Sequence, residues 1–397
     1  MRKDWLLLIA FFTATFAPAS LSAAEVVRIN EFGVLPVAYS QTAGSSAMSG
    51  EVASIAPVVE SARGGNLGSC RDCNGDCNGD CGDGCGAGCG KGDCGCVPYW
   101  AHRNSVMAEL MLLRARDVEV AYAVPIDGPI APGAPGAQVG PTGVADLEYD
   151  VGFRVGFNWA LDDCSSVAMV YSHFDSAASD TITATAPDVV RSLVMHPNSA
   201  NAAVDNLMAR ATNSVDFQLV DLDFRHAWSA SDCHVVNWVV GARYAHLDQD
   251  FSSEFENLGI STVDTDIKFD GGGLRLGLEA ERRARGGLSL FAKGYASFVA
   301  GDFDASYRQY DVISDARVYN SWNAGRVVTM LDLEAGLAWT SFSGRVRATA
   351  GYVLSGWYNT AKTNDWINAV RTGNYLDMTD SEVLTFDGFT TRLEYRW

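Results

Sequence analysis

The most constraining feature of the chain is strict alternation of apolar residues with polar or glycine residues from Leu147 to Trp159. Seven apolar side chains are separated by six polar or glycine positions without an exception. Successive side chains of a β-strand point to opposite faces, so this segment would present one apolar face and one polar face. Thirteen residues exceed the usual soluble strand of about 5–6 and suit a tilted strand that crosses a bilayer. The segment therefore predicts a transmembrane β-strand.

Nine further segments alternate in the same way and bring the predicted number of strands to ten. They are Val106–Arg116, Val167–Phe174, Val215–Trp228, Val235–Leu247, Ile267–Glu281, Leu288–Phe298, Val327–Trp339, Val346–Leu354 and Phe389–Trp397. In two of them the apolar parity changes, between Leu219 and Val220 and within Gly271–Gly273. Because a slip of one residue turns a strand's faces over, we expect a β-bulge at each of these places.

The connections between these segments alternate strictly between short and long. The short ones are Asp162–Ser165, Ser229–Asp232, Ala284–Gly287 and Phe342–Gly344, and the long ones are Val118–Asp146, Asp175–Asn213, Asp248–Asp266, Ala300–Ala324 and Trp357–Glu382. Bacterial membrane barrels have short periplasmic turns and long extracellular loops. We therefore predict an all-β fold, a single antiparallel transmembrane β-barrel over residues 100–397. It has about ten strands, within a range of roughly 8–12, and both of its ends are periplasmic.

The N-terminal region predicts export. Residues 1–24 have the pattern of a signal peptide, with Arg2 and Lys3 before the apolar core Trp5–Phe16 and a small-residue cleavage site at Ser22–Ala24. That core is shorter than the roughly 20 residues of a membrane-spanning helix. Residues 25–69 form a low-complexity arm, which we expect to be largely unstructured. The exported chain is then either a soluble protein or a barrel.

Residues 70–96 form a separate segment rich in Cys, Gly and Asp. Its cysteines are Cys70, Cys73, Cys77, Cys81, Cys85, Cys89, Cys94 and Cys96. Internal disulfides are the favoured interpretation in an oxidising compartment, with cross-links to other envelope proteins second and a thiolate metal site third. Cys164 and Cys233 fall in two successive short turns, where a disulfide between them is possible.

The polar faces of the predicted strands carry charges of both signs. They are Asp150, Arg154, Asp216, Asp221, Asp223, Arg225, Arg243, Arg275, Glu279, Lys293, Asp332, Glu334, Arg347, Arg392, Glu394 and Arg396. They could line a water-filled channel with some ion selectivity or close the lumen as ion pairs. The small interior of a ten-stranded barrel favours the closed form. We expect no catalytic residue and no cofactor, because no spacing motif sets apart a His with Asp or Ser. The net charge of −19 also argues against nucleic acid as a partner.

The terminal strand places Phe389, Leu393, Tyr395 and Trp397 on one face, against Arg392 and Glu394 on the other. Ending on an aromatic residue, it resembles the last strand of bacterial outer-membrane barrels. The resemblance implies that the barrel-assembly machinery reads these aromatic residues and that the faces of the strand meet outer-membrane lipid and the lumen.

Several segments also resemble the Legionella-type major outer membrane protein family, including its planctomycete relatives. They are Ala108–Arg114, Ala121–Pro125, Gly152–Phe157, Gly287–Phe291, Gly301–Phe303, Leu384–Gly388 and Tyr395–Trp397. The resemblance covers roughly residues 100–397 and implies an outer-membrane β-barrel without catalytic residues. The cysteine-rich segment is not part of the family pattern.

Three functions follow from these observations. The favoured one is an outer-membrane barrel with a structural or surface-interaction role through long extracellular loops. The alternatives are a general-diffusion porin with a charged lumen and a secreted soluble β-protein.

Overall fold

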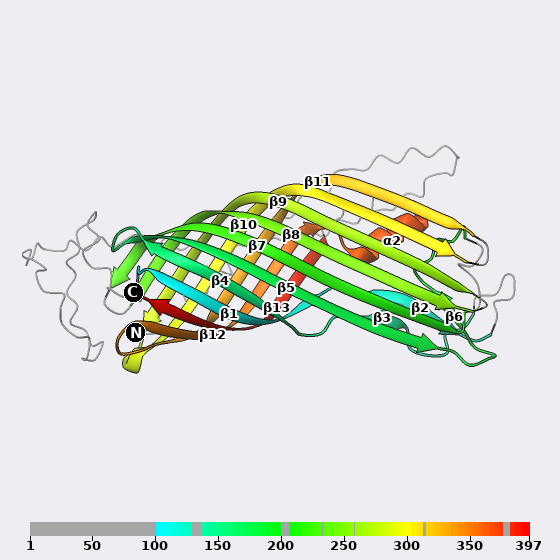
Figure 1. Cartoon of the computed structure of the whole chain (residues 1–397), viewed down its shortest axis with the longest axis horizontal. Helices are drawn as coiled ribbons and strands as arrows, with labels where there is room; N and C mark the ends of the chain where they lie inside the picture. The colour runs from blue at the N-terminus through cyan, green and yellow to red at the C-terminus, as the bar shows by residue number, and fades with distance from the viewer. Residues whose placement is uncertain are drawn as a thin grey trace, which may run out of the picture. The chain divides into compact units, whose positions relative to one another are not determined.

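In a computed structural model the described residues are 101–128, 136–199, 206–231, 234–257, 259–312, 315–375 and 382–397. Ten of their strands close into an antiparallel barrel (Figure 1). These strands are β1 (Ser105–Arg116), β4 (Asp150–Ala160), β5 (Ser165–Thr183), β7 (Met208–Ser231), β8 (His234–Glu256), β9 (Ile260–Arg283), β10 (Leu288–Asp311), β11 (Arg317–Thr340), β12 (Val346–Thr360) and β13 (Glu382–Arg396). The predicted ten-stranded barrel is confirmed.

The barrel closes between the first and last strands, where Ser105 of β1 is the register partner of Arg396 of β13. Around the barrel the order is β1, β13, β12, β11, β10, β9, β8, β7, β5, β4. The short turns lie at the end that holds Trp397, the periplasmic end of a bacterial barrel. In the β9–β10 turn, Gly287 has a φ of 81°, and a Cβ there would lie 2.3 Å from the Thr340 carbonyl oxygen. Only glycine fits this turn without strain.

An apolar belt surrounds the periplasmic half of the barrel. Tryptophans that point outward mark the periplasmic edge of this belt. They are Trp159, Trp228 and Trp339, all exposed. From Tyr149, just before β4, to Trp159 near its end, the belt covers ten residue steps, which span roughly 25 Å along the barrel axis at the usual strand tilt. That height equals the apolar band of membrane barrels.

Beyond this belt, the two faces of the same strands exchange chemical character. Along β7 the inward residues change from Asp221 and Asp223 to Phe217 and Val215, and the outward Leu222 gives way to Gln218. Charged residues fill the lumen at membrane depth, where the outside is apolar. Beyond the membrane, apolar residues fill the interior and polar residues face water. We call this outer half the extracellular head.

This exchange of chemistry corrects the two predicted bulges. At Leu219 and Val220, β7 pairs with β5 and β8 in unbroken register, and its register shift lies between Ala227 and Ser229 instead. At Gly271–Gly273, β9 pairs with β8 and β10 without a shift. At these two places the parity of the strand does not change. The surroundings of each face change, from lipid to water outside and from ion pairs to an apolar core inside.

Two predicted long loops are largely strand and a third, 175–213, is about half strand, which is a second correction. Residues assigned to the loops 175–213, 248–266 and 300–324 extend β5 and β7 to β11 into the head (Figure 1). The extended strands contribute Phe251, Phe255, Val263, Ile267 and Phe303 to one buried apolar cluster. Burying these side chains contributes about 1.5–3 kcal/mol each, which supports strands beyond the bilayer.

The remaining elements complete the head. A separate sheet has the order β3 (Gly143–Ala145), β2 (Val120–Ile126), β6 (Val189–Ser192), and α2 spans Thr363–Thr372. The helix buries Trp366, Ile367 and Val370, and Gly373, whose φ is 66°, caps its C-terminus. The sequence predicted neither the sheet nor the helix. No described helix has the length and apolar character needed to cross a membrane.

Several predictions fall on residues 1–100, outside the part of the chain that the structure describes. They are the signal peptide, the low-complexity arm and the fate of the eight cysteines between Cys70 and Cys96.

Candidate functional site

The lumen at membrane depth holds a network of ion pairs. The predicted residues Asp150, Arg154, Arg225, Arg243, Arg275, Glu279, Lys293, Asp332, Glu334, Arg347, Arg392 and Glu394 all lie on inward faces of the barrel strands. Asp221, Asp223 and Arg396 are buried with them. Asp216 is the exception: it points outward, where its Oδ2 lies 3.4 Å from Nδ1 of His173. It occupies an outward position of β7 beyond the apolar belt.

Several of these ion pairs cross the lumen. Arg243 on β8 contacts Asp332 on β11, with Nη1 and Oδ2 2.6 Å apart. Arg347 on β12 contacts Glu281 on β9 at 2.7 Å. The ions join strands that lie three positions apart around the barrel. Because the desolvation of each buried ion is costly, the network persists only while its partners stay paired.

Glu109 on β1 is a lumen residue that was not among the predicted ones. Its fully buried carboxylate accepts hydrogen bonds from Arg154 at 3.0 Å and from Arg392 at 2.6 Å. The sequence pattern could have identified Glu109 as a lumen residue. It is the one charged residue on the face of a predicted strand that lies opposite Leu110 and Leu112. It links β4 to β13 through the first strand of the barrel.

Above the ions, aromatic rings fill the lumen. Phe217 on β7 and Trp357 on β12 have ring centroids 5.7 Å apart. Counted around the barrel, β7 and β12 are five strands apart in either direction, so the two rings meet across the full width of the lumen. Phe174 and Phe386 complete the cluster, with Phe386 4.8 Å from Phe217. This aromatic plug was not predicted, because a bulge was the expected cause of the change of parity at Leu219.

Two small cavities lie within the charged part of the lumen. The first, about 100 Å³, is lined by residues of the periplasmic end such as His102, Ser105 and Arg396. The second, about 70 Å³, lies between the ion network and the plug, beside Arg243 and Phe217. Both volumes exceed the space that a single water needs, so each cavity has room for several waters.

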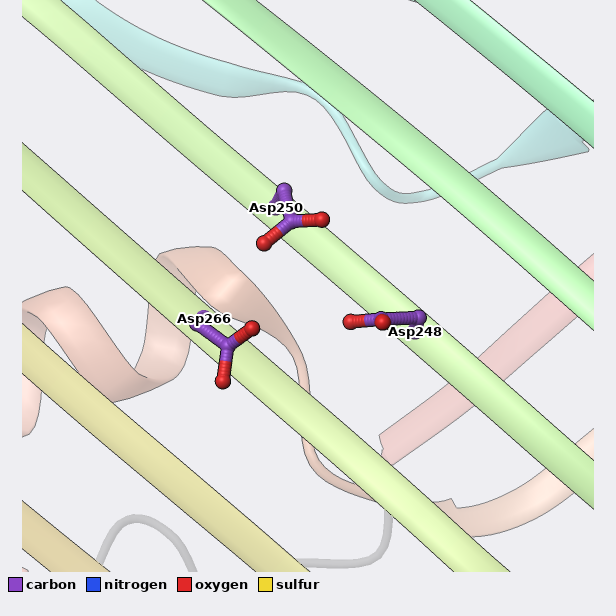
Figure 2. A group of neighbouring side chains, drawn as sticks. All are labelled: Asp248, Asp250 and Asp266. Atoms are coloured by element: carbon purple, nitrogen blue, oxygen red, sulfur yellow. The ribbon is translucent and has the colours of Figure 1, made fainter.

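A group of carboxylates lies on the outer face of the head (Figure 2). Asp248 and Asp250 on β8 face Asp266 on β9, and their nearest oxygen atoms lie within 4.8 Å of one another. Oxygen ligands of this kind suit a hard cation such as Ca²⁺. Here Nζ of Lys268 already supplies a positive charge, 3.0 Å from Asp266 and 3.3 Å from Asp248.

The crowding of these carboxylates changes their chemistry. Partial burial, followed by the neighbouring charge of Asp248 and a hydrogen bond with Asp266, raises the pKa of Asp250 to about 6. The group therefore takes up a proton under mildly acidic conditions.

The terminal strand presents its two faces as the alternation indicates. Leu393, Tyr395 and Trp397 are exposed on the outer surface, and the rings of Tyr395 and Trp397 stack 6.2 Å apart. Cys164 is buried in the β4–β5 turn, whereas Cys233 lies outside the described residues, so the disulfide between them stays a prediction.

The sequence comparison decides the family. Residues 97–397 match the family model described as Legionella pneumophila major outer membrane protein precursor. The chain belongs to this family. The match covers the whole barrel. It starts directly after the cysteine-rich segment and leaves that segment out, as the resemblance in the sequence implied. The family and the closed barrel place the protein in the bacterial outer membrane, with its apolar belt in membrane lipid.

Solved structures that resemble this family member are other outer-membrane barrels. The Escherichia coli outer membrane protease OmpT is 10% identical, with 74% of this chain and 97% of that chain covered and a TM-score of 0.39. The Pseudomonas putida toluene transporter TodX is 11% identical, with 74% and 89% covered and a TM-score of 0.32. No curated protein matched the sequence. Likenesses this remote carry no argument about activity.

Proposed function

We propose that the protein is a non-conducting outer-membrane barrel with a structural or surface-interaction role, exercised through the extracellular head. The contact between Phe217 and Trp357 carries the proposal, because it joins opposite walls of the barrel inside the lumen. Beneath the rings, Arg154 of β4 approaches Glu334 of β11 to 3.7 Å across four strands. Two different kinds of contact therefore block the same passage.

The rival function, a general-diffusion porin, needs a continuous aqueous path. Barrels of 16–18 strands leave such a path, whereas side chains nearly fill a barrel of this size. The two cavities of about 100 and 70 Å³ are too small for a hydrated solute and are lined by side chains already engaged in ion pairs. The charges of the lumen stabilise its closed form in this proposal.

Planar-bilayer recording of the purified full-length chain tests the proposal. We expect no long-lived open steps, while flotation of the same preparation with liposomes verifies insertion. A second preparation carrying Phe217→Ala and Trp357→Ala shows whether the ion layer alone still blocks conduction. Stable unitary openings of the unsubstituted chain would overturn the closed-barrel function in favour of the porin.

We also propose that the barrel-assembly machinery reads the exposed aromatic residues at the end of β13. Deletion of Trp397 should lower the fraction of chain that reaches the outer membrane in heat-modifiable form, because the terminal recognition element is lost. Trp397→Phe, which keeps an aromatic terminus, should retain most of that fraction. Equal assembly of the deletion and the intact chain would argue against this role.

A further inference from the structure

The periplasmic cavity of about 100 Å³, here called the vestibule, has an excess of positive charge. Six cationic side chains line it, Arg103, Arg225, Lys293, Arg347, Arg392 and Arg396. Three glutamates oppose them in the lining, and Glu334 and Glu109 pair with Lys293 and Arg392 from the adjoining layer of the lumen. This excess is unusual in a chain whose net charge is −19. The vestibule therefore keeps a small positive excess, six cations against the five carboxylates in or beside its lining, in an acidic protein.

The glutamates of the vestibule are already engaged. Glu279 lies 3.2 Å from Arg225, Glu281 lies 2.7 Å from Arg347, and Glu394 lies 2.9 Å from Arg396. Nε of Arg225 and Nε of Arg347 are nevertheless buried without a hydrogen-bond partner among the described residues. A buried guanidinium donor without an acceptor is costly, so an added carboxylate would be stabilised there.

The described chain enters at this cavity. Ala101 and His102, the first described residues, both line the vestibule. The cysteine-rich segment ends at Cys96, five residues before Ala101, a span of at most roughly 17 Å. A binding site this close meets its own tethered segment at a high effective concentration, which a free ligand would have to match.

The charge of that segment complements the vestibule. Residues 70–96 contain five aspartates, Asp72, Asp76, Asp80, Asp83 and Asp93, against Arg71 and Lys91, a net charge of −3. Glycines beside most of the cysteines permit sharp turns of the backbone. An aspartate side chain also suits the available volume, which accommodates a carboxylate with one or two waters.

We propose that the vestibule binds the chain's own segment 70–96 through its aspartate carboxylates, so that the cysteine-rich segment docks at the periplasmic mouth of the barrel. The inference is independent of whether the barrel conducts. Docking places eight cysteines beside the membrane at the periplasmic surface, which no feature of the barrel itself requires. Other anions, such as an acidic envelope polymer, are the competing occupants.

Photo-cross-linking in the full-length chain tests the docking. We would replace Phe291, a buried residue of the vestibule, with benzoylphenylalanine and identify the cross-linked peptides by mass spectrometry. Leu290, the outward neighbour of Phe291, carries the same probe as a matched control. We expect cross-links to residues 70–96 from position 291 and none from position 290.

Charge variants of the segment separate docking from mere proximity. Replacing the five aspartates by asparagine, or adding 0.5 M salt, should lower the yield at position 291 at least about fivefold, because the Debye length falls below about 5 Å. Replacing them by glutamate should leave most of the yield. Should the probe at position 291 prevent folding, zero-length carbodiimide coupling between Lys293 and the aspartates of the unsubstituted chain answers the same question.

Two results would overturn the proposal. One is a yield that the asparagine variant leaves unchanged, since contact would then not depend on the carboxylates. The other is cross-linking in whole cells to a foreign envelope molecule in place of residues 70–96, since the vestibule would then serve another anion.

Discussion

Leu393 shows how strongly one position of a membrane strand depends on its surroundings. Its side chain is 60% exposed on the outer face of β13, within the apolar belt. Replacing it by arginine should lower the free energy of unfolding by about 2–4 kcal/mol, because a cation would enter the lipid core. Urea titration in lipid vesicles measures the change.

A matched control lies on the same outward face above the membrane. Thr212 of β7 is exposed in the head, so Thr212→Arg should change the free energy of unfolding by less than about 0.5 kcal/mol. Equal losses for the two arginine variants would contradict the assigned position of the belt.

Asp250 should make the β8–β9 hairpin sensitive to pH. Its pKa is about 6 in the folded chain against an ordinary value of 3.8, so folding favours the protonated carboxyl. The stabilisation is present at low pH and is lost as the pH rises through about 6. Hydrogen exchange of the hairpin, corrected for intrinsic rates, should show greater protection at pH 5 than at pH 7.

Two neutralised variants isolate the residue responsible. Asp250→Asn should remove the difference between the two pH values, since the amide does not titrate there. Asp264→Asn, on the same outer face of the hairpin, should retain it. An unchanged pH step in the Asp250 variant would assign the titration to another group.

At the scale of elements, we expect the membrane half of the barrel to fold independently of α2. Trp366 is fully buried, donates a hydrogen bond to the Ser306 carbonyl of β10 at 3.0 Å and lies 6.4 Å from the Trp322 ring. Trp366→Ala should lower the stability of the head by about 3–5 kcal/mol through lost packing. The barrel should still migrate as a heat-modifiable band, because its belt and lumen pairs are untouched.

Limited proteolysis checks where the damage falls. New cleavage sites in the Trp366 variant should lie within the extracellular head, whereas Asn364→Ala, an exposed position of the same helix, should add none. Loss of heat-modifiability in the Trp366 variant would mean that the head and the membrane barrel fold as one unit.

The elements also show which parts of the fold a sequence can reveal. Period-two alternation found all ten barrel strands, since it records a local property of each strand. The meaning of the parity change at Leu219 depends on where water and lipid begin, which no short window contains. The same difficulty hid the extended ends of β8 and β9, because polar outward residues there look like loop sequence.

The candidate site was predictable to a similar extent. Alternation assigned inward charges such as Arg243 and Asp332, but their pairing depends on contacts between strands far apart in sequence. The plug formed by Phe217 and Trp357 could have been inferred only by keeping the parity constant. Helix α2 escaped prediction because ten residues within a long connection give a weak periodic signal.

On the scale of the whole molecule, the orientation predicts which lysines a cell exposes. Lys268 lies on the outer face of the head, half exposed, whereas we place Lys91 in the periplasmic extension. A membrane-impermeant amine reagent applied to intact cells should modify Lys268 and leave Lys91 unmodified. Both should react after the outer membrane is permeabilised. The reverse pattern would invert the orientation.

The continuous strands have a mechanical consequence. Strand β10 runs for 24 residues in unbroken register with both neighbours, roughly 80 Å of sheet without a hinge between bilayer and head. At the usual tilt, the tip of β10 stands roughly 30–35 Å above the apolar belt. The continuous strands therefore hold the head rigidly at a fixed height above the membrane. A partner must therefore approach to that distance, and a pull on the tip is transmitted directly to the wall of the barrel.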